Sequence, residues 1–328
     1  MKYEPGYLRL LANGELEKRV QVLNRLLERC TVCPRNCKVN RLKDEQGYCL
    51  AGRQPYVVSV CDHHGEEPVL SGTKGSGTVF FGGCNLRCVY CQNYQISQRP
   101  RYYWQFETSV KELAQHLLHL QNDLGVHNIN FVSPSHFVPQ MVEAIYLAAK
   151  RGLHLPIVYN TNAYDALHVL RLLEGIVDIY LPDFKYFNDE HAWQYSKVKD
   201  YVPVAKAAVK EMFRQVGTLK LDEQGLAVRG LIVRHLILPN NLSDSELVLE
   251  WIARELSPQV SISLMAQYFP SYKAEKYPLL SRKIRYSEYL KTVEELTRLG
   301  FDRGFTQHLD APEHYLPDFE KEGHPFED

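Results

Sequence analysis

The sequence lacks three things: an apolar run of 18 or more residues, an excess of charge of either sign, and any cysteine after position 91. Without such an apolar run, no segment is expected to cross a membrane. The 38 basic and 39 acidic residues leave a net charge of −1, which argues against a nucleic-acid partner. Residues 1–6 have no apolar signal-peptide core, so we expect a cytoplasmic location.

The eight cysteines therefore all lie in the first third of the chain. In a cytoplasmic chain, clustered cysteines indicate metal ligands rather than disulfides. Four of them form the first group: Cys30, Cys33, Cys37 and Cys49. By count they fit a structural zinc or a second [4Fe–4S] cluster equally, with zinc slightly preferred and four free thiols as the remaining alternative. Cys61, His63 and His64 are left unassigned, and Glu66 and Glu67 fit a solvated pair.

The second group, Cys84, Cys88 and Cys91, has the spacing C-x3-C-x2-C and follows an apolar run and two glycines. Three thiolates on one loop suit an iron–sulfur cluster, which normally takes four ligands. The absent fourth ligand leaves one iron open to a small molecule, so we interpret this loop as a reaction centre. A structural zinc would need four closed ligands, and Cys61 is the sole further cysteine in sequence reach.

From about residue 78, short apolar stretches alternate with amphipathic ones, which predicts repeated strand–helix units. We expect strands over 78–81, 128–132, 157–159, 177–181, 230–238 and 260–265. We expect helices over 14–29, 109–123, 138–151, 164–173, 243–255 and 285–299, two more within 188–217, and a hairpin over 219–228. Two of these helices should begin with capping boxes, Ser109–Glu112 and Ser243–Glu246.

Six such units are too few for a closed eight-stranded barrel. The predicted fold class is therefore α/β: a partial (β/α)6 TIM-like barrel with an N-terminal cysteine-rich metal-binding segment. We divide the chain into an N-terminal helix and cysteine-rich segment (1–70), the partial barrel (71–310) and a C-terminal surface extension (311–328). Chemistry is expected at the carboxyl ends of the strands.

The C-x3-C-x2-C loop resembles that of the radical S-adenosylmethionine (SAM) enzymes, and the aromatic Tyr90 before its last cysteine fits their pattern. The longer stretch 64–93 is similar to proteins related to the pyruvate formate-lyase activating enzyme. This resemblance covers about residues 28–310. It implies a [4Fe–4S] cluster on Cys84, Cys88 and Cys91 that cleaves SAM reductively to methionine and a 5′-deoxyadenosyl radical, which abstracts a hydrogen atom.

The resemblance also implies an activating-enzyme-like oxidoreductase with a flavodoxin- or ferredoxin-like electron donor. Its substrate, a protein glycine or a small molecule, is not named by the sequence. A non-enzymatic iron–sulfur or metal-binding electron-transfer protein that uses the same cysteines is the alternative.

Polar residues at the strand ends are candidates for binding SAM. Ser133 and Ser135 stand where relatives often carry a Gly-Gly-Glu run that binds the amino group, with an ordinary turn as the alternative. Asn160 and Asn162 lie in a stretch similar to the Thr-Asn-Gly of activating enzymes, with Ala163 in the glycine place. These two amides could bond the ribose or cap the next helix.

Three further candidates follow from the same resemblance. Asp183 and Lys185 are similar to an Asp-x-Lys that lies beside the cofactor, where Lys185 would neutralise the SAM carboxylate; a surface ion pair is the alternative. His235 matches a histidine that contacts the cofactor, although a satisfied core histidine fits as well. Gln267, after the sixth predicted strand, could line the adenine or substrate side.

Overall fold

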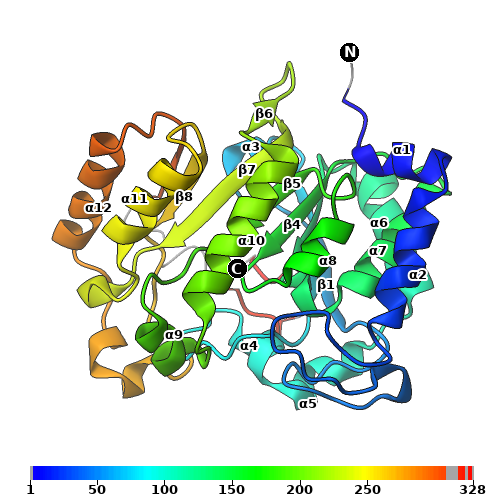
Figure 1. Ribbon diagram of the computed structural model, residues 1–328, viewed down its shortest axis with the longest axis horizontal. Helices are drawn as coiled ribbons and strands as arrows, with labels where there is room; N and C mark the ends of the chain where they lie inside the picture. Colours follow the sequence, from blue (N-terminus) through cyan, green and yellow to red (C-terminus); the bar gives the residue numbers. More distant parts are fainter. Residues whose placement is uncertain (1–2, 308–316, 322–323, 327–328) are drawn as a thin grey trace.

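The computed structural model describes residues 3–307, 317–321 and 324–326. Within them, the centre of the fold is a nine-stranded sheet in the order β1-β2-β3-β4-β5-β7-β8-β9, with β6 paired to β7 (Figure 1). The strands have these bounds: β1 Val57–His63, β2 Ser76–Phe81, β3 Ile129–Val132, β4 Ile157–Thr161, β5 Ile179–Pro182, β6 Lys220–Leu221, β7 Ala227–Leu236, β8 Ser261–Met265 and β9 Gly304–Thr306.

The neighbouring strands from β2 to β9 along this path run parallel, whereas β1 is antiparallel to β2 and β6 is antiparallel to β7. Every residue of β2, β3, β4, β5 and β8 is buried. Burial on both faces is typical of parallel strands, because the connecting helices cover one face and the interior of the fold covers the other.

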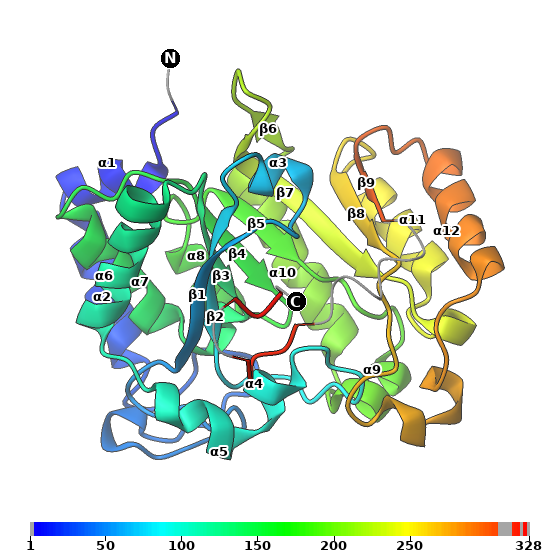
Figure 2. The same cartoon turned by 180° about the vertical axis from the view of Figure 1, so that it is seen from behind.

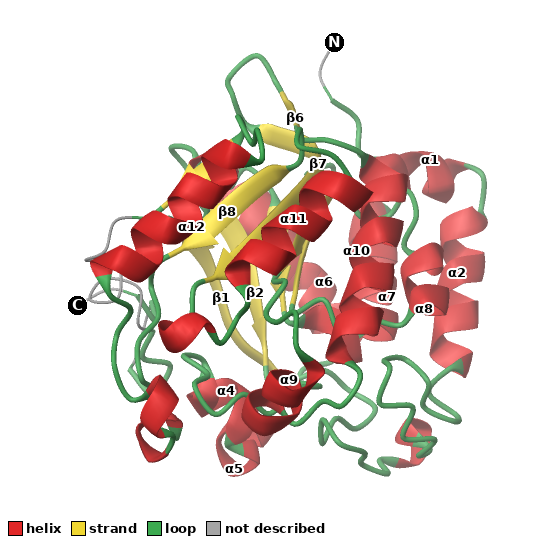
Figure 3. Ribbon diagram, turned by 60° about the vertical axis from the view of Figure 1, so that its left-hand side comes forward, coloured by secondary structure: helices red, strands yellow, loops and turns green. Residues whose placement is uncertain are grey.

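The longer α-helices that follow the parallel strands cover the outer face of the sheet, as α10, α11 and α12 show in Figure 3. Their bounds are α1 Gly6–Ala12, α2 Glu15–Arg25, α3 Pro68–Ser71, α4 Tyr94–Gln98, α5 Pro100–Tyr103, α6 Val110–His119, α7 Val138–Ala149, α8 Leu167–Leu172, α9 Asp189–Ser196, α10 Tyr201–Val216, α11 Ser245–Glu255 and α12 Tyr286–Arg298. The N-terminal helices α1 and α2 pack on α7, outside this helical layer.

The inner face of the sheet surrounds a cavity. Side chains from both edges of the sheet, His63 on β1 and Phe305 and Thr306 on β9, line this one cavity. A flat sheet could not bring its two edge strands to the same space, so the sheet is curved into an open, barrel-like arrangement. The short helix α3 lies near the beginning of β4 and β5, where Leu70 packs with Val158 and Ile179.

The six predicted strands correspond to β2, β3, β4, β5, β7 and β8. Two strands of the main sheet were missed. β1 lies before residue 78, where no strand was predicted, and β9 is only three residues long and mostly exposed. Because β1 pairs with β2, part of the predicted N-terminal segment 1–70 belongs to the main sheet; the predicted domain boundaries themselves stay predictions.

One of the two predicted capping boxes is confirmed. The Ser109 side chain accepts from the Glu112 backbone, and the Glu112 carboxylate accepts in return from the Ser109 amide. The other prediction was wrong, because α11 has Asp244 as its N-cap and that side chain makes no capping bond. The Ser243 hydroxyl instead accepts from the Leu238 amide at 3.3 Å, a contact that depends on the tertiary fold.

The predicted surface extension 311–328 falls partly outside the described residues. Residues 317–321 and 324–326 lie against the open side of the sheet, where Figure 2 shows them in red near the C-terminus label. Phe319 is buried among Phe80, Ile96 and Val132. Within this described part, Phe319 therefore belongs to a buried cluster rather than to the exposed surface. Among the described helices, none is both long and apolar enough to span a bilayer.

Candidate active site

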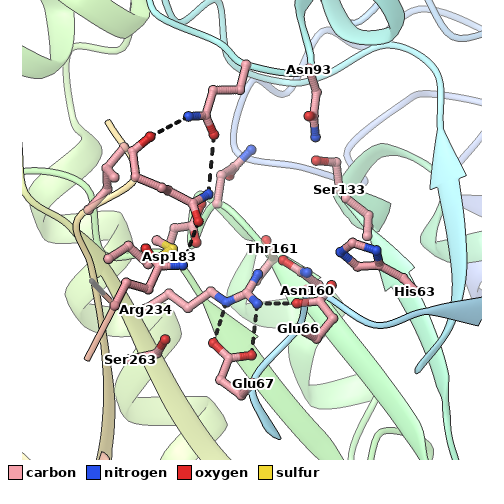
Figure 4. A pocket seen from close by; sticks show the side chains of 18 of the residues that line it. His63, Glu66, Glu67, Asn93, Ser133, Asn160, Thr161, Asp183, Arg234 and Ser263 are labelled. Atoms are coloured by element: carbon pink, nitrogen blue, oxygen red, sulfur yellow. Dashed lines mark hydrogen bonds and ion pairs between the residues drawn. The ribbon is translucent and has the colours of Figure 1, made fainter. Parts of the chain in front are cut away.

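The cavity inside the curved sheet has a volume of about 910 Å³. The cluster loop borders it, and so do the carboxyl ends of the central parallel strands. Figure 4 shows its polar lining, with His63, Ser133, Asn160, Asp183 and Arg234 arranged around it. Ten of the residues proposed from sequence line this cavity: Cys84, Cys88, Cys91, Tyr90, Ser133, Asn160, Asn162, Asp183, Lys185 and Gln267.

The cysteine loop begins directly after β2, at Gly82 and Gly83. Gly83 has φ +80°, and a Cβ there would lie 2.9 Å from the carbonyl oxygen of Cys49. Only glycine meets both conditions, because other residues are strained at this φ and their side chain would collide with backbone. The glycine thus lets the first cysteine group pack directly against the loop that carries the second.

Each thiol of this loop contacts a polar side chain. Two of these side chains are distant in sequence, and the third lies on α4, directly after the loop. The Asn162 amide donates to Cys84 Sγ at 3.6 Å, and the Ser196 hydroxyl donates to Cys88 Sγ at 3.0 Å. The Ser97 hydroxyl lies 3.2 Å from Cys91 Sγ. Neither serine was singled out from the sequence, because nothing in the chain pattern links either position to the cysteines.

The three thiols fit the ligand set of an iron–sulfur cluster. They come from one loop, none is in a disulfide, and all open onto the same cavity. Burial is the main cause that raises the pKa of Cys84 to about 11 and that of Cys91 to about 12. Without a metal they are therefore neutral thiols near pH 7, and iron would bind with release of protons.

A lysine lies among these thiols. Lys185 Nζ is 2.5 Å from Asp183 Oδ2, and both side chains line the cavity, so this pair is not a surface pair. Burial alone would lower the Lys185 pKa, but the charge of Asp183 and its hydrogen bond to the ammonium group oppose this effect, and the pKa is raised. A positive charge is thereby held beside the cluster loop.

A second ionic group, absent from the sequence prediction, forms the part of the cavity beside α3. Arg234 on β7 donates to both oxygens of Glu67, each at 2.8 Å, and also pairs with Glu66 (Figure 4). The Glu66 and Glu67 side chains are only 6% and 3% exposed. The interpretation of these glutamates as a solvated pair was wrong, because Arg234 draws both of them into the fold.

The polar side chains at the ends of β3 and β4 have different contacts. Ser133, which has φ +56°, and Asn160 line the cavity. Asn162 accepts from the Tyr164 amide and donates to Asn85, so its side chain braces the loop beside Cys84. It does not cap α8, whose N-cap is Ala166. Ala163 has φ +62°, which gives a physical reason for a glycine in that place.

Gln267 joins two other glutamines at the mouth of the cavity. Its side-chain oxygen accepts from Gln307 at 2.6 Å, and its backbone oxygen accepts from Gln92 at 2.7 Å. All three line the cavity. The hydrogen bonds among these three glutamines link the cluster loop, the end of β8 and the segment after β9, three parts that are far apart in sequence.

Two proposed SAM-binding residues point elsewhere. His235 is fully buried, with Nδ1 donating to the Phe184 carbonyl at 2.7 Å and Nε2 2.8 Å from the Ser245 hydroxyl. Of the two alternatives for His235, a cofactor contact or a core histidine with its hydrogen bonds satisfied, the structure has the second. Burial lowers the His235 pKa to about 4. Ser135 does not line the cavity either; its hydroxyl lies 3.1 Å from Thr161 Oγ1 inside the core.

The first cysteine group is also brought together. A small pocket is lined by all four thiols, those of Cys30, Cys33, Cys37 and Cys49, and by His136, whose Nδ1 has no partner among the described residues. The Tyr48 amide donates to Cys37 Sγ at 3.3 Å. In the part of the chain that the structure describes, no three or more His, Cys, Asp or Glu side chains are arranged to hold a single metal ion. A metal at these four cysteines stays a prediction.

The unassigned residues Cys61, His63 and His64, on β1 or directly after it, lie in different environments. Cys61 is buried with Phe80 and Phe319, and it lines neither the large cavity nor the pocket of the first cysteine group. His63 lines the cavity and its ring lies 4.1 Å from that of Phe326. His64 is more exposed and lies 3.7 Å from Asp62. Phe326 lines the cavity too, so the described C-terminal residues contribute to its wall.

Comparison with known proteins identifies the class. The model of the Radical SAM superfamily matches residues 78–221, which contain the cysteine loop and strands β3 to β5. Residues 78–221 of this chain therefore belong to the radical SAM superfamily. It is similar to two uncharacterized proteins of Methanocaldococcus jannaschii: MJ0674, 33% identical over 88% of this chain and 80% of that protein, and MJ0808, 25% identical over 76% and 73%.

Solved structures with a similar chain course include HydG, described as a maturase of the [FeFe]-hydrogenase, with TM-score 0.49 and 11% identity over 89% of this chain and 56% of HydG. They also include Streptococcus suis SuiB bound to S-adenosylmethionine, with TM-score 0.44 and 14% identity over 70% of this chain and 50% of SuiB. This chain therefore spans about half the length of these two proteins.

Proposed function

We propose that this protein is an enzyme that cleaves S-adenosylmethionine reductively and uses the 5′-deoxyadenosyl radical to abstract a hydrogen atom. One observation carries the proposal: the thiols of Cys84, Cys88 and Cys91 open together onto one large cavity, and each has its own polar neighbour. A [4Fe–4S] cluster with one open iron, bound at these thiolates, would supply the electron for the cleavage.

The side chains around the loop have distinct parts in this proposal. Lys185 holds a positive charge that would attract the SAM carboxylate, and Asp183 fixes its position. Ser133, Asn160 and Gln267 line the cavity and would bind the polar parts of SAM. Tyr90, within the loop itself, is buried and would help to keep water from the thiols. The 910 Å³ volume leaves room for a substrate beside SAM.

The reaction subtype is part of the proposal. The similarity of residues 64–93 to proteins related to the pyruvate formate-lyase activating enzyme supports an activating-enzyme-like oxidoreductase. A flavodoxin- or ferredoxin-like protein would then donate the electron. The substrate would be a protein glycine or a small molecule.

The test is cofactor cleavage. Protein reconstituted anaerobically with iron and sulfide, then given SAM and dithionite, should release 5′-deoxyadenosine, which chromatography measures. Cys88→Ala should abolish the product, while Cys61→Ala, outside both cysteine groups, should retain it. Protein that carries a full cluster but yields no 5′-deoxyadenosine would overturn the proposal and leave the electron-transfer alternative.

We also propose that Cys30, Cys33, Cys37 and Cys49 bind a metal, either zinc or a second [4Fe–4S] cluster. Support comes from their common pocket and from the amide donated to Cys37. Metal analysis of a Cys84/Cys88/Cys91→Ala triple variant separates the choices. Retained iron with sulfide indicates a cluster, retained zinc indicates a structural ion, and protein free of both contradicts a metal at this group.

A further inference from the structure

A chain of buried hydroxyl groups leads from the cavity wall to the sulfur of Cys88. Tyr90 Oη lies 2.6 Å from Tyr186 Oη, and Tyr186 Oη lies 2.7 Å from Ser196 Oγ. Ser196 Oγ in turn lies 3.0 Å from Cys88 Sγ. The four residues come from the cluster loop, the segment after β5 and the last position of α9, so only the tertiary fold brings them together.

Once Cys88 is a thiolate, the direction in which the hydrogen bonds of this chain are donated is determined. A thiolate accepts hydrogen bonds and has no proton to donate, so Ser196 must be the donor. The Ser196 oxygen is then free to accept from Tyr186, and the Tyr186 oxygen from Tyr90. Aligned donors polarise one another in a buried site, so the two tyrosines strengthen the hydrogen bond that Ser196 gives to the sulfur.

The position of Ser196 is set by backbone contacts rather than by its side chain. The Arg87 amide donates to the Ser196 carbonyl at 3.1 Å, and the Val89 amide donates to the Tyr195 carbonyl at 2.8 Å. These two bonds hold the cluster loop to the end of α9 on either side of Cys88. Loss of the Ser196 hydroxyl alone should leave this attachment in place.

Among the three thiols of the loop, Cys88 has the shortest of the side-chain contacts to sulfur given above, and its donor is the first of a chain of buried hydroxyl groups. Ser196 and Tyr186 are fully buried, so water cannot replace the hydroxyl that either one supplies. Hydrogen bonds to the sulfur ligands are one of the factors that set the reduction potential of an iron–sulfur cluster. They favour the reduced state, because reduction adds negative charge that the donors stabilise.

We infer that Ser196 is a positioning residue that, supported by Tyr186 and Tyr90, donates to the Cys88 thiolate and raises the reduction potential of the cluster held there. The inference rests on the proposed function, since it needs a cluster on Cys84, Cys88 and Cys91. It assigns no contact with SAM or substrate to Ser196, which acts on the chemistry only through Cys88.

The experiment is an anaerobic redox titration of the reconstituted cluster, followed by electron paramagnetic resonance, together with iron and sulfide content. Ser196→Ala should shift the midpoint potential to a more negative value at unchanged iron content. Tyr186→Phe keeps the Ser196 hydroxyl and should give a smaller shift in the same direction. Ser243→Ala and Tyr180→Phe, which remove buried hydroxyls outside this chain, should leave the midpoint unchanged.

The outcomes are distinct. A Ser196→Ala protein with full iron content and the wild-type midpoint would show that the hydroxyl is merely structural and would overturn the inference. If Ser196→Ala fails to fold or to hold iron, Tyr186→Phe decides, and an unchanged midpoint there counts against the chain. A wild-type protein that assembles no cluster would instead refute the proposed function on which the inference depends.

Discussion

Arg234 and Glu67 form a two-point ion pair inside the curved sheet, with Nε–Oε1 and Nη2–Oε2 distances of 2.8 Å each. The pair joins β7 to the residue before α3, two segments that are 167 positions apart in sequence. Glu66 shares the same guanidinium, so two carboxylates depend on one positive charge. The Glu67 pKa stays below its ordinary value because Arg234 outweighs the opposing effect of burial.

Arg234→Leu should strongly destabilise the protein, because it leaves two buried carboxylates without their countercharge. Removing one partner of a buried ion pair typically costs about 3–5 kcal/mol in the free energy of unfolding. Urea denaturation measures the change. Arg298→Ala is the control, since Arg298 is 60% exposed and its loss should leave the urea midpoint nearly unchanged. Similar midpoints for both variants would contradict a buried ionic role for Arg234.

His235 should make stability depend on pH. Burial lowers its pKa to about 4 from an ordinary 6.5, so between these values the unfolded chain binds more protons than the native one. The stabilisation is complete above pH 6.5 and falls as the pH drops towards 4, by up to roughly 3 kcal/mol.

His235→Gln should therefore show a flatter loss of stability than wild type between pH 7 and 4, as followed by urea denaturation at each pH. His154→Gln alters an exposed histidine and should keep the wild-type slope. If the free energy of unfolding of wild type and of His235→Gln fell equally steeply with falling pH, protonation of His235 would not be a cause of the lost stability.

Lys185→Met should weaken SAM binding without loss of iron. The ammonium group lines the cavity beside Asp183, and its charge is the part of the site suited to a carboxylate. We expect the dissociation constant for SAM to rise about tenfold or more, which corresponds to roughly 1.4 kcal/mol. Anaerobic equilibrium dialysis on reconstituted protein measures it, with the exposed Lys150→Met as control. An unchanged dissociation constant would remove Lys185 from the SAM site.

Phe319→Ala should loosen the C-terminal residues that lie against the open side of the sheet. Phe319 packs on Phe80 at a ring distance of 5.1 Å, and the Gln95 side chain bonds both Asp318 and the Phe319 amide. Loss of this buried phenylalanine side chain should lower the free energy needed to detach the segment from the sheet by about 2 kcal/mol. The detached form should then be populated roughly 30-fold more than in wild type.

Limited proteolysis should then cleave Phe319→Ala faster than wild type within residues 317–326. Trp193→Ala, which removes a side chain that is 48% exposed, should leave the cleavage pattern unchanged. Wild-type cleavage rates in the Phe319 variant would show that this contact does not hold the segment.

The sequence by itself determined the local features of this protein. The C-x3-C-x2-C loop, the apolar strands β2, β3, β4, β5, β7 and β8 and the Ser109 capping box each follow a local pattern of residue types that is visible in the chain. The same holds for Ser133 and Asn160, which follow directly from their places at the ends of parallel strands.

The tertiary structure alone decided which polar side chains meet. Arg234 pairs with Glu66 and Glu67, while its neighbour His235 points into the opposite layer, because successive residues of a strand face opposite sides. Ser196 reaches Cys88 across 108 positions only because α9 ends beside the cluster loop. Such contacts depend on how elements pack, and neither residue spacing nor local composition encodes that packing.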